Sequence, residues 1–289
     1  MSSETNVLGR DIGHVIESGL PSGSGVAYLI DPTLQILRAV IEIGVDAETF
    51  PSVRVLADRS LLKTVLDDFP VASNAAELVD RGALDLRVVT ATAGNALLVT
   101  DASVVAIVAA GEQVAGLATA DESFVREANE TYRTRFEAAE PFSLRTPALS
   151  TIRSSLEAEF GSAVRTDFDA VLASIDTTDG PDLDEVAISL LVAARNDVLL
   201  YDISKWGEDT GIASKATFSR TKTDLEDAGL IETEKVPIDV GRPRLRLKLN
   251  EDRFEEATPA EGLLHTARFW PPSDKPSHPR FRRSPRVDW

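Results

Sequence analysis

The feature that most constrains the fold of this chain is the order of patterns between Asp202 and Asn250. Two short helical patterns come first, separated by a turn that contains glycine. Two segments, 231–236 and 244–249, then alternate in polarity at the two-residue period of a β-strand, with Gly and Pro between them. Helix, turn, helix and a two-stranded ribbon in this order predict a winged helix-turn-helix.

Capping residues predict the limits of the two helices. The first helix is expected to begin behind Asp202, and the turn at 211–213 leads to Ser214, the expected N-cap of the second helix. Gly229 is expected to end the second helix. Its buried face should hold two apolar residues that lie seven positions apart, Phe218 and Leu225.

The predicted DNA contacts lie on the second helix and on the ribbon. The side chains expected to face the major groove, where arginine pairs with guanine, are Lys215, Thr217, Ser219 and Arg220. Those expected to hold phosphates or to reach the minor groove are Lys222, Thr223, Arg242, Arg244 and Arg246. The alternative, above all for Lys222, is an ion pair with acidic neighbours such as Asp224 and Glu226.

Charge is distributed unevenly along the chain. The net charge of −17 argues, taken alone, against a nucleic-acid partner. Residues 211–250, however, carry eight basic and six acidic side chains, a balance of +2, whereas residues 1–180 carry 13 basic and 27 acidic, a balance of −14. Five of the seven lysines fall within 205–248. Basic side chains are therefore concentrated where the winged helix is predicted.

The surplus of Asp and Glu, the scarcity of lysine and the lack of cysteine are typical of a halophile, although an ordinary acidic protein is the alternative. At about 1 M salt the screening length is about 3 Å, so the acidic domains would repel DNA only weakly. Binding would then depend on hydrogen bonds to base edges and on shape more than on counterion release.

Composition also limits the chemistry of the chain. Without cysteine there is no disulfide, no Cys-ligated zinc and no thiol catalysis. The three histidines have no metal-ligand spacing, and carboxylates are too abundant to single out a catalytic pair. We therefore expect no catalytic residues, no metal and no cofactor. No leader and no apolar run of about 20 residues is present, which predicts a cytoplasmic protein without membrane contact.

The first 143 residues predict a mixed-sheet α/β domain of two or three layers. Strand patterns alternate with helical ones, and a meander and a closing helix follow: strands at 26–30, 53–57 and 84–90, a helix at 34–43, one or two helices at 60–81, a meander at 96–100, 104–108 and 114–118, and a helix from 121 to 137. In open α/β sheets ligands bind beyond the carboxyl ends of strands. The polar residues there are candidates for a small-molecule effector site: Asp31, Asp58, Arg59, Thr100 and Asp101. The alternative is that they cap helices and complete turns.

Residues 144–180 predict a helical linker with a long apolar stripe: Ile152, Leu156, Phe160, Val164, Phe168, Val171 and Leu172. The stripe fits either a core of the chain itself or a dimer interface. Helix-turn-helix proteins usually bind paired half-sites as dimers, which favours a homodimer. Residues 181–255 would then form the winged helix-turn-helix domain, and the Pro- and Arg-rich segment 256–289 is expected to be largely disordered.

Three segments, 146–150 (TPALS), 188–194 (ISLLVAA) and above all 201–249, resemble a known family. The chain resembles the haloarchaeal transcriptional regulators called TbsP over residues 5–255. The resemblance implies a DNA-binding regulator of central carbon metabolism that acts near genes of gluconeogenesis, alongside a sugar-responsive regulator of the TrmB type. It also implies that the N-terminal domain is similar to the effector domains of that class, with the domain order reversed.

The sequence therefore predicts a sequence-specific regulator that binds double-stranded DNA. Two alternatives remain open: a metabolite-binding module whose winged helix mediates protein assembly, and an enzyme built on the α/β domain. The lysines and the alternating ribbon argue against the first, and no residue pattern supports the second.

Overall fold

The computed structural model describes residues 6–9, 11–21, 25–90, 94–111, 113–175, 184–237 and 243–250. The chain divides into two compact units, residues 1–159 with 207–212, and residues 160–206 with 213–289. The predicted wing residue Arg242 and the predicted tail, 256–289, lie outside the described residues.

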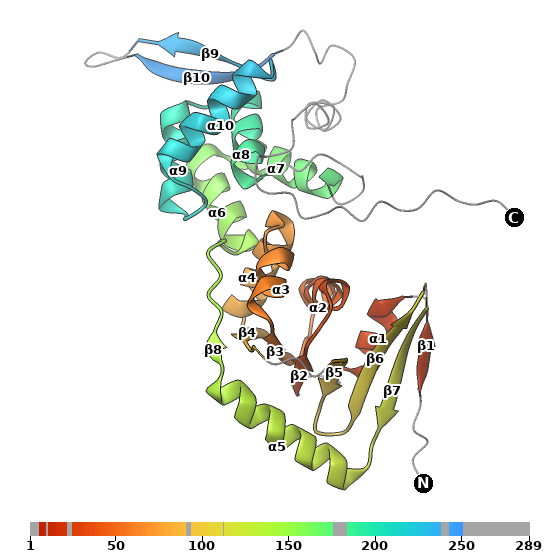
Figure 1. Ribbon diagram of the computed structural model, residues 1–289. Helices are drawn as coiled ribbons and strands as arrows, with labels where there is room; N and C mark the ends of the chain where they lie inside the picture. Colours follow the sequence, from red (N-terminus) through yellow and green to blue (C-terminus); the bar gives the residue numbers. More distant parts are fainter. Residues whose placement is uncertain are drawn as a thin grey trace, which may run out of the picture. The chain divides into compact units, whose positions relative to one another are not determined.

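An eight-stranded mixed sheet forms the centre of the first unit (Figure 1). Its strand order is β1-β7-β6-β5-β2-β3-β4-β8, and only β2, β3 and β4 pair in parallel. The strands are β1 (Val7–Gly9), β2 (Val26–Ile30), β3 (Ser52–Ala57), β4 (Leu84–Val88), β5 (Ala96–Val99), β6 (Val104–Ala110), β7 (Gln113–Thr119) and β8 (Glu140–Pro141). The predicted strands and the antiparallel meander of β5, β6 and β7 are confirmed. Strands β1 and β8 were not predicted, because segments this short show no alternation.

Helices cover both faces of this sheet, which makes three layers (Figure 1). One face carries α1 (Ile12–Gly19), α2 (Leu34–Asp46), α3 (Arg59–Val65) and α4 (Phe69–Asp80), and the other carries α5 (Glu122–Ala138). The larger core lies under α1 to α4. The smaller core, under α5, is built around Tyr28 and Phe136, whose rings meet edge to face at 5.9 Å. The mixed α/β domain predicted from the sequence is therefore confirmed.

The predicted apolar stripe is divided between two helices, α6 (Leu149–Phe160) and α7 (Ser162–Ile175). Gly161 separates them with φ = +91°, a conformation that glycine adopts without strain. The stripe is buried within the single chain, since Ile152 and Phe168 are both 0 % exposed. The core interpretation of these residues therefore fits the structure, and the stripe is not a free surface for a second copy.

In the second unit, α8 (Glu185–Arg195) is buried on all sides. Asp184 caps it by accepting a hydrogen bond from the backbone N–H of Ala187 at 2.8 Å. Around it lie α7, α10 (Lys215–Asp227) and the hairpin of β9 (Ile231–Val236) and β10 (Arg244–Leu249). A fully buried helix of this kind fixes the elements that surround it.

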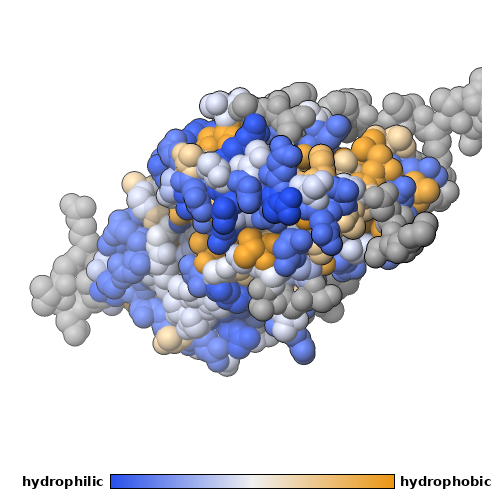
Figure 2. All heavy atoms as spheres, turned by 90° about the horizontal axis from the view of Figure 1, so that it is seen from below, coloured by the Kyte–Doolittle hydropathy of each residue, from blue (hydrophilic) through white to orange (hydrophobic). Residues whose placement is uncertain are grey.

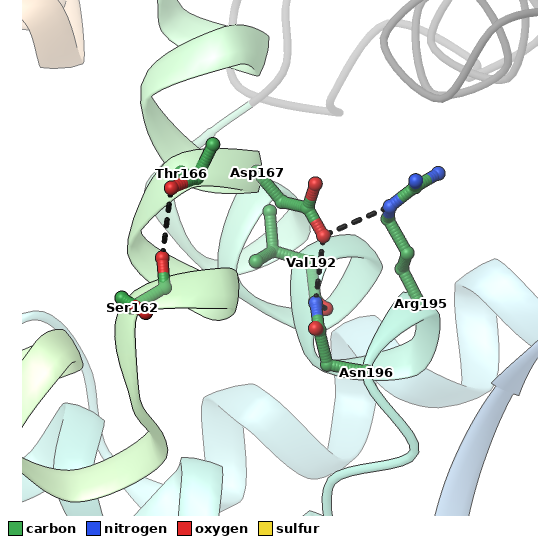
Figure 3. A network of polar contacts seen from close by, with 6 residues as sticks. All are labelled: Ser162, Thr166, Asp167, Val192, Arg195 and Asn196. Carbon is green, nitrogen blue, oxygen red and sulfur yellow. Dashed lines mark hydrogen bonds and ion pairs between the residues drawn. The ribbon is translucent and has the colours of Figure 1, made fainter.

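A polar network holds the end of α8 against α7 (Figure 3). The Asp167 carboxylate accepts hydrogen bonds from Arg195 Nε at 2.8 Å and from Asn196 Nδ2 at 2.9 Å. After this network the chain turns at Asp197, which has φ = +55°, and Leu199 forms a β-bridge with Arg246 of β10. The bridge carries the chain directly into the next helix, α9 (Leu200–Asp209).

Within the described residues, no helix is both long and apolar enough to cross a membrane.

Candidate nucleic-acid interface

The first helix of the predicted motif begins earlier than expected. Helix α9 starts at Leu200, so Asp202 lies inside its first turn and is not the N-cap, which corrects the prediction. The bridge at Leu199 explains the difference, because it delivers the chain to the helix two residues before the aspartate. Asp202 instead places a carboxylate oxygen 3.4 Å from Arg244 Nη1. An acidic side chain in this position also suits the positive end of the helix dipole.

The turn and the second helix have the predicted form. Gly211 adopts φ = +83°, and α10 begins after Ser214, whose hydroxyl accepts a hydrogen bond from Thr217 N–H at 3.2 Å. Phe218 and Leu225 are both 0 % exposed, so the predicted buried face is confirmed. The cap and the buried face fix which side of α10 points to solvent.

Five exposed residues lie opposite the buried face of α10: Ala216, Ser219, Arg220 and Thr223, and near the end of the helix Asp227. Arg220 has no hydrogen-bond or ion-pair partner among the described residues. The acidic residues of the helix gather toward its other end, where Asp224 and Asp227 are exposed. The N-terminal half of α10 is therefore the half suited to a polyanion, since it also carries the positive end of the helix dipole.

Thr217 lies at the flank of this surface. It is half-buried, and its hydroxyl lies 3.0 Å from the Ser214 hydroxyl. Thr223, in contrast, is exposed and donates its hydroxyl hydrogen to the Ser219 carbonyl oxygen at 3.1 Å. Each of these threonine hydroxyls therefore already has a partner within the helix end or the helix backbone.

The Lys222 side chain is largely buried and forms an ion pair within the second unit. Its ammonium group pairs with the Glu226 carboxylate, and its side chain is only 13 % exposed. Glu226 also accepts a hydrogen bond from the Thr233 hydroxyl of β9 at 2.7 Å. Burial raises the pKa of Glu226, but the hydrogen bonds from Lys222 and Thr233 and the Lys222 charge outweigh it, so the pKa is lowered. The ion pair anticipated as the alternative for Lys222 is thus present.

The ribbon face that carries the predicted contacts Arg244 and Arg246 is mixed in charge. In the pairing register Arg246 lies opposite Glu234, and Lys248 lies opposite Glu232. The closest approaches to Glu234 are 3.8 Å from Arg246 Nη1 and 3.5 Å from Lys248 Nζ. The sequence pattern of β10 alone does not identify the residues across the hairpin. The pairing register was needed to show that acidic residues of β9 lie opposite Arg246 and Lys248.

An exposed aromatic residue that the sequence analysis did not single out joins two of the predicted basic residues. The Tyr201 ring, 48 % exposed, lies 4.6 Å from the Arg244 guanidinium and 5.9 Å from Lys215 Nζ. We call Tyr201, Lys215 and Arg244 the Tyr201 cluster. The cluster takes one residue from each of α9, α10 and β10. The sequence feature that could have indicated it is Tyr201, a bulky aromatic residue in the first turn of α9.

The candidate effector residues of the first unit divide between two ends of the sheet. Asp31 and Asp58 follow the parallel strands β2 and β3, so they lie at one end, and the Asp31 N–H donates to the Leu56 carbonyl at 2.9 Å. Asp58 caps α3, and hydrogen bonds from the Ser60 hydroxyl and backbone N–H lower its pKa. Arg59 pairs with Glu140 at 2.7 Å.

Thr100 and Asp101 lie at the opposite end of the sheet, so the five candidate residues do not all come together. Strand β5 is antiparallel to β2, so the residue after Val99 lies near the start of β2 and not near its end. Thr100 is 2 % exposed, and its hydroxyl accepts the Ser103 N–H at 3.0 Å within the β5–β6 turn. Asp101 lines a separate cavity of about 340 Å³ beside α5. The sequence pattern could not reveal that Thr100 and Asp101 lie apart from Asp31 and Asp58, because it does not give the direction of each strand in the sheet.

These features define the class of the protein. A helix-turn-helix followed by a two-stranded ribbon, with an exposed polar and basic helix face, is a winged helix-turn-helix domain, and here it follows a three-layer α/β domain.

Comparison with protein families identifies the family within this class. Residues 4–147 match the model described as transcriptional regulator TbsP-like, N-terminal, and residues 148–268 match the model for the TbsP-like C-terminal HTH domain. The chain therefore belongs to the TbsP-like transcriptional regulators, as its resemblance indicated.

No curated protein matches the chain. Among solved structures, the chain is similar to TrmBL2, described as an archaeal chromatin protein that shows a novel mode of DNA binding. The identity is 18 % and the TM-score 0.34, over 48 % of this chain and 54 % of that chain. The match thus spans about half the length of TrmBL2.

Proposed function

We propose that this regulator binds specific sequences of double-stranded DNA through the N-terminal half of α10. The observation that carries the proposal is the exposed Arg220, which has no partner among the described residues and shares its helix face with Ser219 and Thr223. In an acidic chain, an unpaired arginine on the solvent face of a recognition helix is available for a base edge. Arginine pairs with guanine O6 and N7 in the major groove.

The other predicted contacts take different roles in this proposal. Lys215 and Arg244, held beside the Tyr201 ring, would grip phosphates next to the groove, and the Tyr201 hydroxyl would donate a further hydrogen bond. Ser219 and Thr223 would line the groove, with Thr217 at its margin. The contacts expected of the wing are Arg242 and Arg246. Lys222 would act indirectly, by holding α10 against β9 through Glu226.

We extend the proposal to salt and to the target genes. The net charge of −17 supports a halophilic setting, in which screening at about 1 M salt leaves only contact-range attraction to DNA. The targets would be genes of central carbon metabolism, gluconeogenesis in particular, as the family resemblance of the sequence implies. A small-molecule effector would bind the first unit, at the end of the sheet that carries Asp31, Asp58 and Arg59, since these three follow parallel neighbours.

The test is a DNA-binding titration of the purified protein at about 1 M KCl. Promoter fragments from the gene's own neighbourhood are compared with unrelated DNA of equal length, and circular dichroism verifies the fold under the same conditions. Saturable binding that prefers one promoter supports the proposal. Equal binding to all fragments by folded protein would contradict it and would favour a winged helix that mediates protein assembly.

A further inference from the structure

Helix α5 covers only part of its side of the sheet. It packs mainly on β2, β3 and β5 and covers β6 only at Val104; on this side of the sheet no described helix covers the rest of β6, β7 or β1. On these three strands, alternate residues such as Val105 and Val114 point into the core under α1. The residues between them point to the uncovered side. The apolar ones that are not buried under α5 are Leu8, Ala106, Val108, Ala110, Ala115 and Leu117. We call these six residues the open sheet face.

The pairing register brings these residues together into one patch. Ala115 lies between Leu8 of β1 and Val108 of β6, and Leu117 lies beside Ala106. The large side chains are well exposed, with Leu8 at 76 %, Leu117 at 50 % and Val108 at 37 %. Figure 2 shows hydrophobic residues gathered over β6 and β7, beside α5. A contiguous apolar patch of this kind marks an interaction surface more often than a random feature of a monomer.

Helix α5 extends the patch at its border. At about 100° per residue, Phe124 lies on the opposite flank of α5 from Arg126 and Arg133, which line the cavity beside the β5–β6 turn. Phe124 therefore lies on the flank toward the open sheet face, and it is 53 % exposed. Its ring adds an aromatic anchor to a surface otherwise built from Ala, Val and Leu.

The distribution of charge indicates which partner binds the open sheet face. Among the described residues of β1, β6 and β7, none on the open side is charged, and the polar ones, such as Gln113 and Thr119, are neutral. Elsewhere two copies of a chain with a net charge of −17 repel each other at ordinary salt. A flat face without charge is where two such copies can meet, and alternating small and large side chains suit sheet-on-sheet packing.

We infer that the open sheet face is the contact between two copies of this chain, packed face to face about a two-fold axis. The choice of a second copy rests partly on the proposed function, because a regulator that reads paired half-sites acts as a pair. Strands β6 and β7 are each about 23 Å long and β1 about 10 Å, and with about 4.8 Å per strand they give about 270 Å² per copy. The total of about 540 Å² is below the roughly 1,200 Å² of a stable specific interface, so the dimer is reversible and depends on concentration.

The first test measures mass by analytical ultracentrifugation over about a hundredfold range of concentration, without DNA. The wild-type chain is expected to pass from monomer to dimer. The variant Val108→Glu/Leu117→Glu is expected to stay monomeric with unchanged circular dichroism. Val79→Glu is the matched control, since Val79 is 40 % exposed on α4, outside the open sheet face, and this variant should dimerise like the wild type. A wild-type chain that stays monomeric throughout would overturn the inference.

A second test stays informative even if the double variant misfolds. Because the chain has no cysteine, a single Leu117→Cys substitution gives one defined thiol per copy. A short bismaleimide should then link two copies of Leu117→Cys far more efficiently than two copies of the control Val79→Cys. Equal linking from both positions, or linking from Val79→Cys alone, would place the contact elsewhere and refute the inference. Since neither test contains DNA, a failure of the dimer is distinguishable from a failure of DNA selectivity.

Discussion

Replacing Arg220 with alanine separates the proposed role of this residue in DNA recognition from any role in folding. The side chain is exposed and makes no hydrogen bond or ion pair with the described residues. Its loss should therefore change the free energy of unfolding by no more than about 0.5 kcal/mol. A bidentate contact with guanine contributes about 1–3 kcal/mol of discrimination, so the affinity for the preferred promoter should fall about 5- to 150-fold.

The assay is a fluorescence anisotropy titration at fixed salt with the preferred promoter and with unrelated DNA, beside a guanidinium unfolding curve of each variant. The matched control is Arg133→Ala, because Arg133 is likewise exposed on a helix and unpaired among the described residues, but belongs to the first unit. Both variants lose one positive charge, so a loss of affinity that appears in both would reflect net charge and not a contact of Arg220 with DNA.

The two DNA fragments also distinguish the kind of contact. If Arg220 reads a base, the loss of affinity falls on the preferred promoter and spares unrelated DNA. If Arg220 holds a phosphate, both fragments lose affinity and the slope of binding against salt falls by about one. An Arg220→Ala protein that binds the promoter within about a factor of two of wild type would show that the assigned recognition face is wrong.

Three further predictions concern the scaffold. Glu226→Gln should lower the free energy of unfolding at about pH 7 by about 1 kcal/mol at most. Because the folded pKa of this carboxyl is lowered, its contribution is present above the unfolded value of 4.5 and is lost as the pH falls through the folded pKa, so the difference from wild type should shrink in acid. A difference in guanidinium unfolding that is the same at every pH would contradict the ion pair with Lys222. Gly116→Ala should destabilise by about 1–3 kcal/mol in thermal unfolding, because a Cβ there would lie 2.9 Å from Val15 Cγ1; an unchanged melting temperature would mean that α1 yields easily. Ser214→Ala should cost about 1 kcal/mol through the lost helix cap and also weaken DNA binding, and full DNA affinity with reduced stability would show that the start of α10 does not contact DNA.

Local patterns predicted the elements of this fold well. The period of apolar residues identified the parallel strands, the meander and the helices, and the Ser214 cap identified the start of α10 from the backbone chemistry of a helix N-terminus alone. The helix-turn-helix was predictable for the same reason, because its turn, caps and buried face all lie within about 30 residues of sequence.

Pairings between distant residues were not predictable from these patterns. The acidic partners of Arg246 and Lys248 on β9 follow from the hairpin register, and the separation of Thr100 from Asp31 follows from the antiparallel direction of β5. The contact of Tyr201 with Arg244 joins residues 43 positions apart. Each depends on tertiary packing that a single sequence does not specify at the level of local propensity.

The hydrogen-bonded link from Lys222 through Glu226 to Thr233 has a mechanical consequence for DNA reading. It ties the last turn of α10, through Glu226, to the first strand of the wing, which restrains the helix and the wing from tilting independently. The angle between α10 and the wing would therefore be set before DNA binds, and little conformational entropy would be lost there on binding. Sequences that bend to fit that fixed angle would bind better than equally matched but stiffer ones.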